Sequence, residues 1–146
     1  FPYTTLFRSF IVNNSHSINS NNFISSLLLS LQESPNIQST VIEKLSNDFV
    51  MSKENNIFIC ITEDDTIKYA QILYERYASQ DYKLIGYGGN EVCTLYLQRG
   101  WITELYSLDP EKIGQMAIRE LFEYRSRGYA NSYVTADVKI VRGQNQ

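Results

Sequence analysis

The stretch that decides the fold is Ile57-Phe58-Ile59-Cys60-Ile61-Thr62-Glu63-Asp64-Asp65. Its first five residues form an unbroken apolar run, and a strand that is apolar on both faces is typical of a parallel sheet covered by helices on each side. The acidic residues that follow can begin a helix, with Asp64 or Asp65 as its N-cap. The apolar positions of that helix recur at helical spacing, at Tyr69, Ala70, Leu73 and Tyr77.

Strands and helices alternate on either side of this stretch. The pattern predicts strands at residues 10–12, 37–42, 83–87, 101–107 and 134–141. It predicts helices from a cap at Ser20 to about residue 34, over about residues 90–99 with Asn90 as cap, and from a cap at Asp109 to a stop at Gly128. A short helical segment is also expected at residues 49–53. The helix after Asp109 carries an apolar stripe that must be buried against something, formed by Ile113, Met116, Ala117, Leu121 and Tyr124.

This alternation predicts an α/β fold, a parallel sheet with helices on both faces. Such sheets bind ligands outside the carboxyl ends of their strands. Three segments occupy that position in the sequence: residues 62–65, 87–90 and 107–109. They locate a candidate site without naming a ligand.

Composition excludes several classes of function. The chain has 146 residues and a net charge of −3, with no basic stripe, so we expect no nucleic-acid binding by this segment. No apolar run reaches the roughly 18–20 residues that a membrane helix needs. Cys60 and Cys93 are too far apart in the sequence to form a redox or metal motif, and we interpret Cys60 as a buried apolar residue.

The first nine residues, Phe-Pro-Tyr-Thr-Thr-Leu-Phe-Arg-Ser, resemble the in-frame translation of a common sequencing adapter. We therefore leave residues 1–9 out of the fold prediction and expect them to make few specific contacts. We also expect the natural beginning of the protein to be missing, together with any signal peptide or lipid anchor.

Five short motifs in residues 57–145 occur in an order that resembles one known family. They are the strand that ends in Thr62-Glu63-Asp64, the run Leu84-Ile85-Gly86-Tyr87-Gly88-Gly89, the run Leu97-Gln98-Arg99-Gly100, the helix start Leu108-Asp109-Pro110, and Asn145. Together they resemble the C-terminal portion of periplasmic sugar-binding proteins and LacI-type effector domains. The family's Gln-Asp-Pro-x-x-Ile-Gly-x-x-Ala signature differs here only at its first position, which is Leu108.

The resemblance implies part of the type I periplasmic-binding-protein fold, in which two lobes close on a ligand. Residues 10–146 would form its C-terminal part, and about 108–130 would belong to the otherwise missing N-terminal lobe. It implies a solute-binding protein that takes a small polar, sugar-like ligand for ABC-type uptake or sensing. Its partners would be an ABC transporter permease or a membrane sensor, and its location extracytoplasmic. The alternative is the effector-binding domain of a cytoplasmic LacI-type transcription regulator.

The same resemblance gives the candidate ligand-binding residues Glu63, Asp64, Tyr87, Gly88, Gly89, Leu108 and Asn19. Three of them depart from the family, which often has Arg, Asp and Gln where this chain has Asn19, Gly88 and Leu108. Losing these hydrogen-bonding groups argues against a typical monosaccharide site. Asp64 either keeps the ligand role of the family's aspartate or serves only as a helix cap.

No pattern in the sequence predicts catalysis. Gly86, Gly88 and Gly89 lack the full dinucleotide or P-loop pattern, so we interpret them as a tight turn between strand and helix. His16 has no nucleophile or metal-ligand partner at a recognisable spacing. The acidic run at residues 63–65 is typical of a solvated helix start. We therefore predict no enzyme activity, no catalytic residues, no metal site and no cofactor.

Overall fold

The structure is a computed structural model, and it describes residues 6–15, 17–131 and 135–143. His16, Asn145, most of the adapter-like segment and the predicted strand start at residue 134 lie outside the described residues. The elements are β1 (Phe7–Val12), α1 (Ile18–Gln32), β2 (Ile37–Ile42), β3 (Asn56–Cys60), α2 (Glu63–Tyr77), β4 (Tyr82–Tyr87), α3 (Glu91–Gln98), β5 (Glu104–Leu108), α4 (Pro110–Arg127) and β6 (Val138–Arg142).

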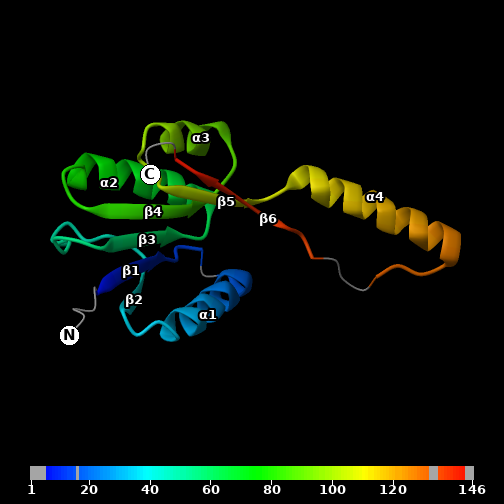
Figure 1. Cartoon of the computed structure of the whole chain (residues 1–146), viewed down its shortest axis with the longest axis horizontal. Helices are drawn as coiled ribbons and strands as arrows, with labels where there is room; N and C mark the ends of the chain where they lie inside the picture. Colours follow the sequence, from blue (N-terminus) through cyan, green and yellow to red (C-terminus); the bar gives the residue numbers. More distant parts are fainter. Residues whose placement is uncertain (1–5, 16, 132–134, 144–146) are drawn as a thin grey trace.

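The described strands form one sheet in the order β2-β1-β3-β4-β5-β6 (Figure 1). The first five strands are parallel, as predicted, but β6 runs antiparallel to β5, with Leu108 opposite Val138. The predicted parallel sheet is therefore confirmed for β1 to β5, and the edge strand β6 is the exception. A parallel strand needs a crossover that carries the chain back to the far edge. Here the chain leaves β5 through α4 and returns at the same edge.

Helices α2 and α3 cover one face of the sheet, and the main apolar core lies beneath them (Figure 1). Its most deeply buried side chains include Phe58, Cys60, Tyr69, Leu73 and Leu84. Helix α1 covers the other face only near β1 and β2, where Ile11 and Ile24 are buried. The α/β class and helices on both faces are confirmed, but the second face is only partly covered by the described elements.

Strand β1 includes part of the adapter-like segment. Phe7, Arg8 and Ser9 pair with β2, and β3 pairs with Arg8 and Ser9 from the other side. Ser9 is buried, and its hydroxyl donates to the Ser39 hydroxyl at 2.8 Å. The expectation that residues 7–9 make few specific contacts is therefore wrong. Their origin as adapter sequence stays a prediction.

Several element boundaries differ from the prediction, two of them because another residue is the helix cap. Ser17 caps α1 where Ser20 was predicted, and Thr62 caps α2 in place of either aspartate. Residues 49–53 form no helix, and β5 begins at Glu104, three residues later than predicted. The predicted caps at Asn90 and Asp109 and the left-handed stop at Gly128 are confirmed.

Helix α4 projects away from the sheet, and none of its residues is buried (Figure 1). The apolar stripe predicted from the sequence therefore lies in solvent, with Leu121 and Tyr124 each more than half exposed. None of the described helices is long and apolar enough to span a membrane.

Candidate functional site

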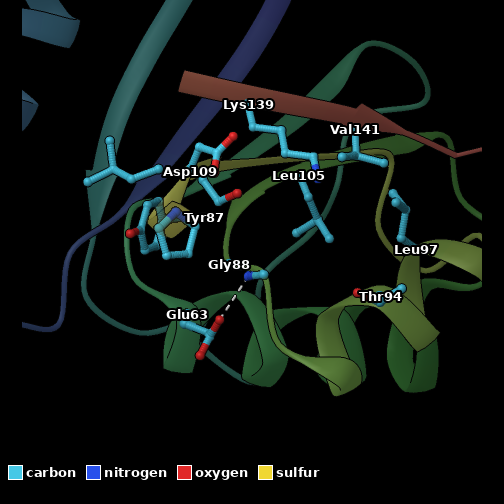
Figure 2. A pocket seen from close by; sticks show the side chains of 13 residues that line it. Glu63, Tyr87, Gly88, Thr94, Leu97, Leu105, Asp109, Lys139 and Val141 are labelled. Atoms are coloured by element: carbon cyan, nitrogen blue, oxygen red, sulfur yellow. Dashed lines mark hydrogen bonds between the residues drawn. The ribbon is translucent and has the colours of Figure 1, made fainter. Parts of the chain in front are cut away.

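The three predicted segments meet at the carboxyl edge of the sheet, as parallel strands require. Between the ends of β4 and β5, the start of α3 and the edge strand β6 lies a cavity of about 500 Å³ (Figure 2). Five of the predicted site residues line it: Glu63, Tyr87, Gly88, Gly89 and Leu108. These five residues therefore lie together, and their role in binding a ligand stays a prediction.

Glu63 ties α2 to the loop after β4. Its carboxylate accepts a hydrogen bond from the backbone amide of Gly89 at 2.9 Å (Figure 2). It accepts a second one from the backbone amide of Asn90 at 3.2 Å. The Gly88 amide donates to the Tyr106 carbonyl oxygen at 3.1 Å. The backbone amides of Gly88 and Gly89, which were predicted to contact ligand, thus donate to groups of the protein itself. Glycine is needed at position 88 because a Cβ there would stand 2.7 Å from Cys93 Sγ.

The two aspartates after Glu63 have different surroundings. Asp64 is exposed and does not line the cavity. Asp65 is buried, and its carboxylate accepts a hydrogen bond from Asn14 Nδ2 at 2.8 Å. Since Thr62 is the N-cap of α2, neither aspartate serves as that cap. The ligand role of Asp64 stays a prediction.

A second polar group lies at the same edge, where β1 ends. Asn13 is buried, and its Nδ2 donates to Asn21 Oδ1 at 3.2 Å. Asn13 Oδ1 is also buried but has no hydrogen-bond partner in the described part of the chain. A buried acceptor without a partner costs about 1–3 kcal/mol, so native proteins seldom leave one unexplained. We call Asn13, Asn14, Asn21 and Asp65 the asparagine cluster.

Sequence reasoning missed this cluster and chose Asn19, which is exposed and does not line the cavity. Asn21 lies two positions further along α1 and reaches Asn13. The available signal was that Asn13 and Asn14 directly follow a strand of a parallel sheet. The contact between Asn14 and Asp65 joins residues 51 positions apart, which a local pattern does not reveal.

The cavity also contains four polar residues outside the predicted ligand-binding set, namely Thr94, Ser107, Asp109 and Lys139. Ser107 and Asp109 lie in the predicted segment 107–109, whereas Thr94 and Lys139 were not predicted. Lys139 reaches it only because β6 is antiparallel to β5 and lies beside Ser107. Asp109 Oδ1 accepts hydrogen bonds from the amides of Glu111 and Lys112, which fixes the start of α4. Acidic, hydroxyl and ammonium groups together can donate to and accept from a polyhydroxyl ligand.

The aromatic residues divide between the site and the core. Tyr87 lines the cavity and meets Tyr106 edge to face, with ring centroids 5.5 Å apart. The Tyr106 hydroxyl donates to the Cys60 carbonyl oxygen at 3.0 Å, and burial raises its pKa. Trp101 stacks on Tyr74 with ring centroids 4.2 Å apart, before the start of β5, and it does not line the cavity.

The surroundings of the two cysteines, Cys60 and Cys93, favour the neutral thiol over the reactive thiolate. Both are buried and unpaired. Burial, followed by the nearby charge of Glu63, raises the pKa of Cys93 to about 11. Among the described residues, no group of three or more His, Cys, Asp or Glu side chains could hold a metal ion.

No protein-family model matches the chain, and no curated protein matches it either. Solved structures do match. GanP, a glucose-galactose binding protein from Geobacillus stearothermophilus, superimposes with a TM-score of 0.74 at 15% identity, over 97% of this chain and 55% of its own. The chain has part of the type I periplasmic-binding-protein fold.

Two further structures support that statement. An ABC transporter periplasmic solute-binding protein from Actinobacillus succinogenes, with bound D-allose, matches at a TM-score of 0.74 and 14% identity, over 95% of this chain and 53% of its own. A protein described as a LacI transcriptional regulator from Bacteroides fragilis matches at 0.63 and 16% identity, over 98% of this chain and 54% of its own. The chain spans about half the length of these proteins, and at such identities the likeness establishes the fold.

Proposed function

We propose that the chain forms one lobe of a solute-binding protein that takes a small polar, sugar-like ligand at the carboxyl edge of its sheet. The observation that carries the proposal is the buried, unpartnered Asn13 Oδ1 in the asparagine cluster. Because this oxygen is buried and Asn13 does not line the cavity, a ligand hydroxyl would have to displace the side chains that cover it before it could donate to it, and this contact would remove the cost of leaving the oxygen without a partner. The fold likeness supports the proposal, since GanP is named as a sugar-binding protein and another neighbour holds D-allose.

Binding in this proposal makes and breaks no covalent bond. The asparagine cluster and the cavity residues would hold the ligand by hydrogen bonds, and closure of a second lobe would complete the site. We also propose that residues 108–130 belong to that second lobe. The exposure of the whole of α4 supports this, because an amphipathic helix gains stability only when its apolar face is buried. An ABC transporter permease or a membrane sensor would then receive the closed protein outside the cytoplasm.

An NMR titration of the chain tests the site directly. D-Glucose, D-galactose, D-arabinose and D-allose are added in turn while the amide and side-chain amide resonances are followed. We expect weak binding, because one lobe supplies half of the contacts, with the largest shifts at Asn13, Asn14 and Asn21. Asn13→Ala should abolish these shifts. Asn47→Ala, which alters an exposed asparagine in the β2–β3 connection, is the matched control and should leave them unchanged.

Two outcomes of the titration would contradict the proposal. One is that none of the four sugars shifts any resonance at the carboxyl edge. The other is that the shifts occur but survive Asn13→Ala, which would show that Asn13 does not bind the sugar.

A second candidate function is the effector domain of a LacI-type regulator, and the match to the Bacteroides fragilis protein favours it. In that case the same lobe closure would act on a DNA-binding segment in the cytoplasm. The upstream reading frame discriminates the two: a signal peptide or lipid anchor supports the solute-binding protein, whereas a helix-turn-helix segment supports the regulator.

A further inference from the structure

An apolar groove of about 610 Å³ lies on the sheet face opposite α2 and α3. It runs from α1 across β3, β4, β5 and β6, and we call it the open sheet groove. Its volume falls within the range of about 300–1,000 Å³ that is usual for small-molecule sites. Most of its floor is formed by Phe23, Ile59, Ile85, Tyr106, Val138 and Ile140.

The groove presents apolar surface and no uncompensated charge. Phe23, Val138 and Ile140 are 48%, 58% and 55% exposed, and contiguous apolar surface of this kind usually marks a binding site. Among the described residues that line the groove, Glu104 is the one charged side chain, and it is already paired with Arg142 at 3.0 Å. The groove therefore suits a neutral, apolar group.

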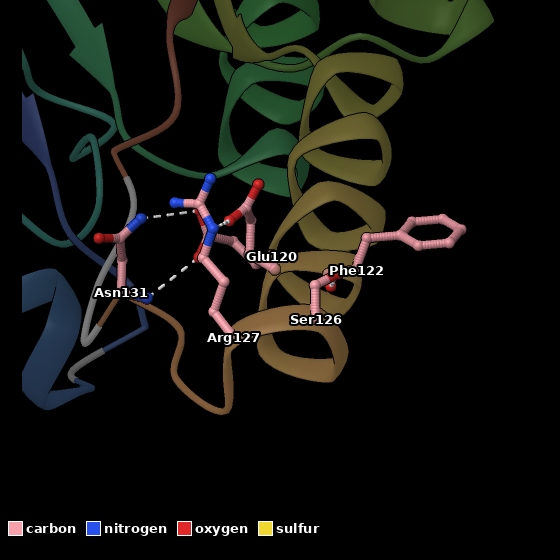
Figure 3. Close-up of polar contacts among 6 residues, drawn as sticks. Glu120, Phe122, Ser126, Arg127 and Asn131 are labelled. Atoms are coloured by element: carbon pink, nitrogen blue, oxygen red, sulfur yellow. Dashed lines mark hydrogen bonds and ion pairs between the residues drawn. The ribbon is translucent and has the colours of Figure 1, made fainter.

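Helix α4 does not cover this groove, and none of its residues lines it. Both carboxylate oxygens of Glu120 accept hydrogen bonds from Asn131, one from its backbone amide at 3.0 Å and one from its side chain at 2.8 Å (Figure 3). Lys112 pairs with Asp137 at 3.6 Å, just before β6 begins. These contacts attach α4 to its own return segment, away from the groove.

The groove is continuous with the candidate ligand cavity. Tyr87, Ser107 and Leu108 line both of them. Successive side chains of a strand point to opposite faces, and accordingly Lys139 lines the cavity whereas its neighbour Ile140 lines the groove. The cavity and the groove therefore lie on opposite faces of the sheet and meet where β4 and β5 end. A ligand that passes over Leu108 would contact both.

The groove also reaches the strand end that carries the asparagine cluster. Ile61 lines the groove and directly follows Cys60, which pairs with Val12 of β1. Asn13 directly follows Val12, so Asn13 and Ile61 stand at the ends of neighbouring strands. The apolar groove thus extends between the two polar parts of the proposed site.

We propose, building on the proposed function, that the ligand is an aryl glycoside. Its sugar is held at the carboxyl edge, and its neutral aromatic aglycone lies in the open sheet groove. The side chains of the groove favour an aromatic group, since Phe23, Tyr87 and Tyr106 line it and the two tyrosines meet edge to face. Aromatic pairs of this kind contribute more than the burial of their area alone.

An NMR titration of the chain with matched glycosides tests the class of ligand. Methyl and phenyl β-D-glucoside, and methyl and phenyl β-D-galactoside, are added in turn, so that each pair shares one sugar and differs in its aglycone. We expect the phenyl glycoside of at least one sugar to bind about tenfold more tightly than its methyl partner, because the ring buries apolar surface. Its shifts should include the side-chain methyl groups of Ile85, Val138 and Ile140 as well as the carboxyl edge.

Two substitutions test where the ring lies. Ile140→Glu and Phe23→Ser alter opposite ends of the groove at exposed positions, so both variants should keep the fold, which circular dichroism checks. Each should lower the affinity for the phenyl glycoside to about that for the methyl glycoside. Val50→Glu is the matched control: Val50 is 84% exposed and lines neither the groove nor the cavity, so this variant should keep the preference for the phenyl glycoside.

Four results would overturn the proposal while sugar binding stands. The first is equal affinity for the methyl and phenyl glycosides, with shifts at the carboxyl edge alone. The second is a preference for the phenyl glycoside that survives both substitutions. The third is phenol alone binding the groove as tightly as the phenyl glycoside does. The fourth is a shift of the groove resonances on dilution of the chain without ligand, which would make a second copy the occupant. If no glycoside and no free sugar shifts the carboxyl edge, the proposed function fails as well.

Discussion

At the scale of single residues, Gly86 shows how closely α2 packs on β4. A Cβ at Gly86 would stand 2.2 Å from Cγ2 of Thr66, which is fully buried. The Thr66 hydroxyl lies within 2.8 Å of the carbonyl oxygens of Thr62 and Tyr87, so this side chain is held in place and cannot turn away.

We therefore expect Gly86→Ala to lower the free energy of unfolding by about 1–3 kcal/mol, the usual range for overpacking a core. Urea unfolding measures the loss. Adding Thr66→Ser removes the methyl group in the way and should restore part of the stability. Gly89→Ala is the control, because a Cβ there would lie 3.8 Å from its nearest neighbour, Ser107, and it should change stability by less than about 0.5 kcal/mol. Equal losses in both single variants would contradict the steric explanation.

Sequence reasoning succeeded for residues whose role is set by their neighbours in the chain. The burial of Cys60 followed from its place in an apolar run, and the cap at Asp109 followed from the adjacent proline. It did not find the asparagine cluster, because the importance of Asn13 depends on Asn21 and that of Asn14 on the distant Asp65. A polar side chain becomes distinctive only when its burial and its partners are known.

At the scale of elements, β1 is the strand whose first half, residues 7–9, was set aside in the prediction although it lies inside the sheet. It lies between β2 and β3, so both of its edges are hydrogen-bonded. The Phe7 amide donates to the Asn36 carbonyl oxygen at 2.8 Å, and the Arg8 amide donates to the Asn55 carbonyl oxygen at 3.0 Å.

Deleting residues 1–9 should therefore lower the free energy of unfolding by more than about 1 kcal/mol, since each lost hydrogen bond contributes about 0.5–1.5 kcal/mol. Chemical unfolding followed by far-ultraviolet circular dichroism provides the measurement. Arg8→Ala keeps the strand backbone and alters only an exposed side chain, so it should have little effect. A truncated chain as stable as the parent would mean that the pairing of Phe7, Arg8 and Ser9 contributes nothing.

The elements that sequence reasoning placed best carry local stop and start signals. Asp109-Pro110 and Gly128 bound α4 as predicted, and Gly128 has the left-handed φ of 78° that favours glycine. The direction of β6 could not be predicted from the sequence, because an alternating pattern is the same for parallel and antiparallel pairing. Its direction depends on where the chain re-enters the sheet, which is a property of the whole path from Leu108 to Val138.

At the scale of the whole molecule, the chain divides into a body and an arm. The body consists of the sheet with α1, α2 and α3, and it contains all of the buried residues of the described helices. The arm is α4, joined to the body at the end of β5 and the start of β6. The candidate site lies where the two meet, since the cavity is lined by Asp109 and Pro110 as well as by the ends of β4 and β5.

This division predicts two levels of stability in one chain. Most of the stability of a helix in a protein comes from the packing of its apolar face, which α4 lacks, whereas a central strand opens only when the body unfolds. The amides of α4 should exchange with solvent far faster than those of β3, whose Phe58 and Cys60 are fully buried. Hydrogen exchange read by mass spectrometry measures both segments at once. If α4 proves as protected as β3, the arm is part of the body's cooperative unit, and the separation argued from its exposure fails.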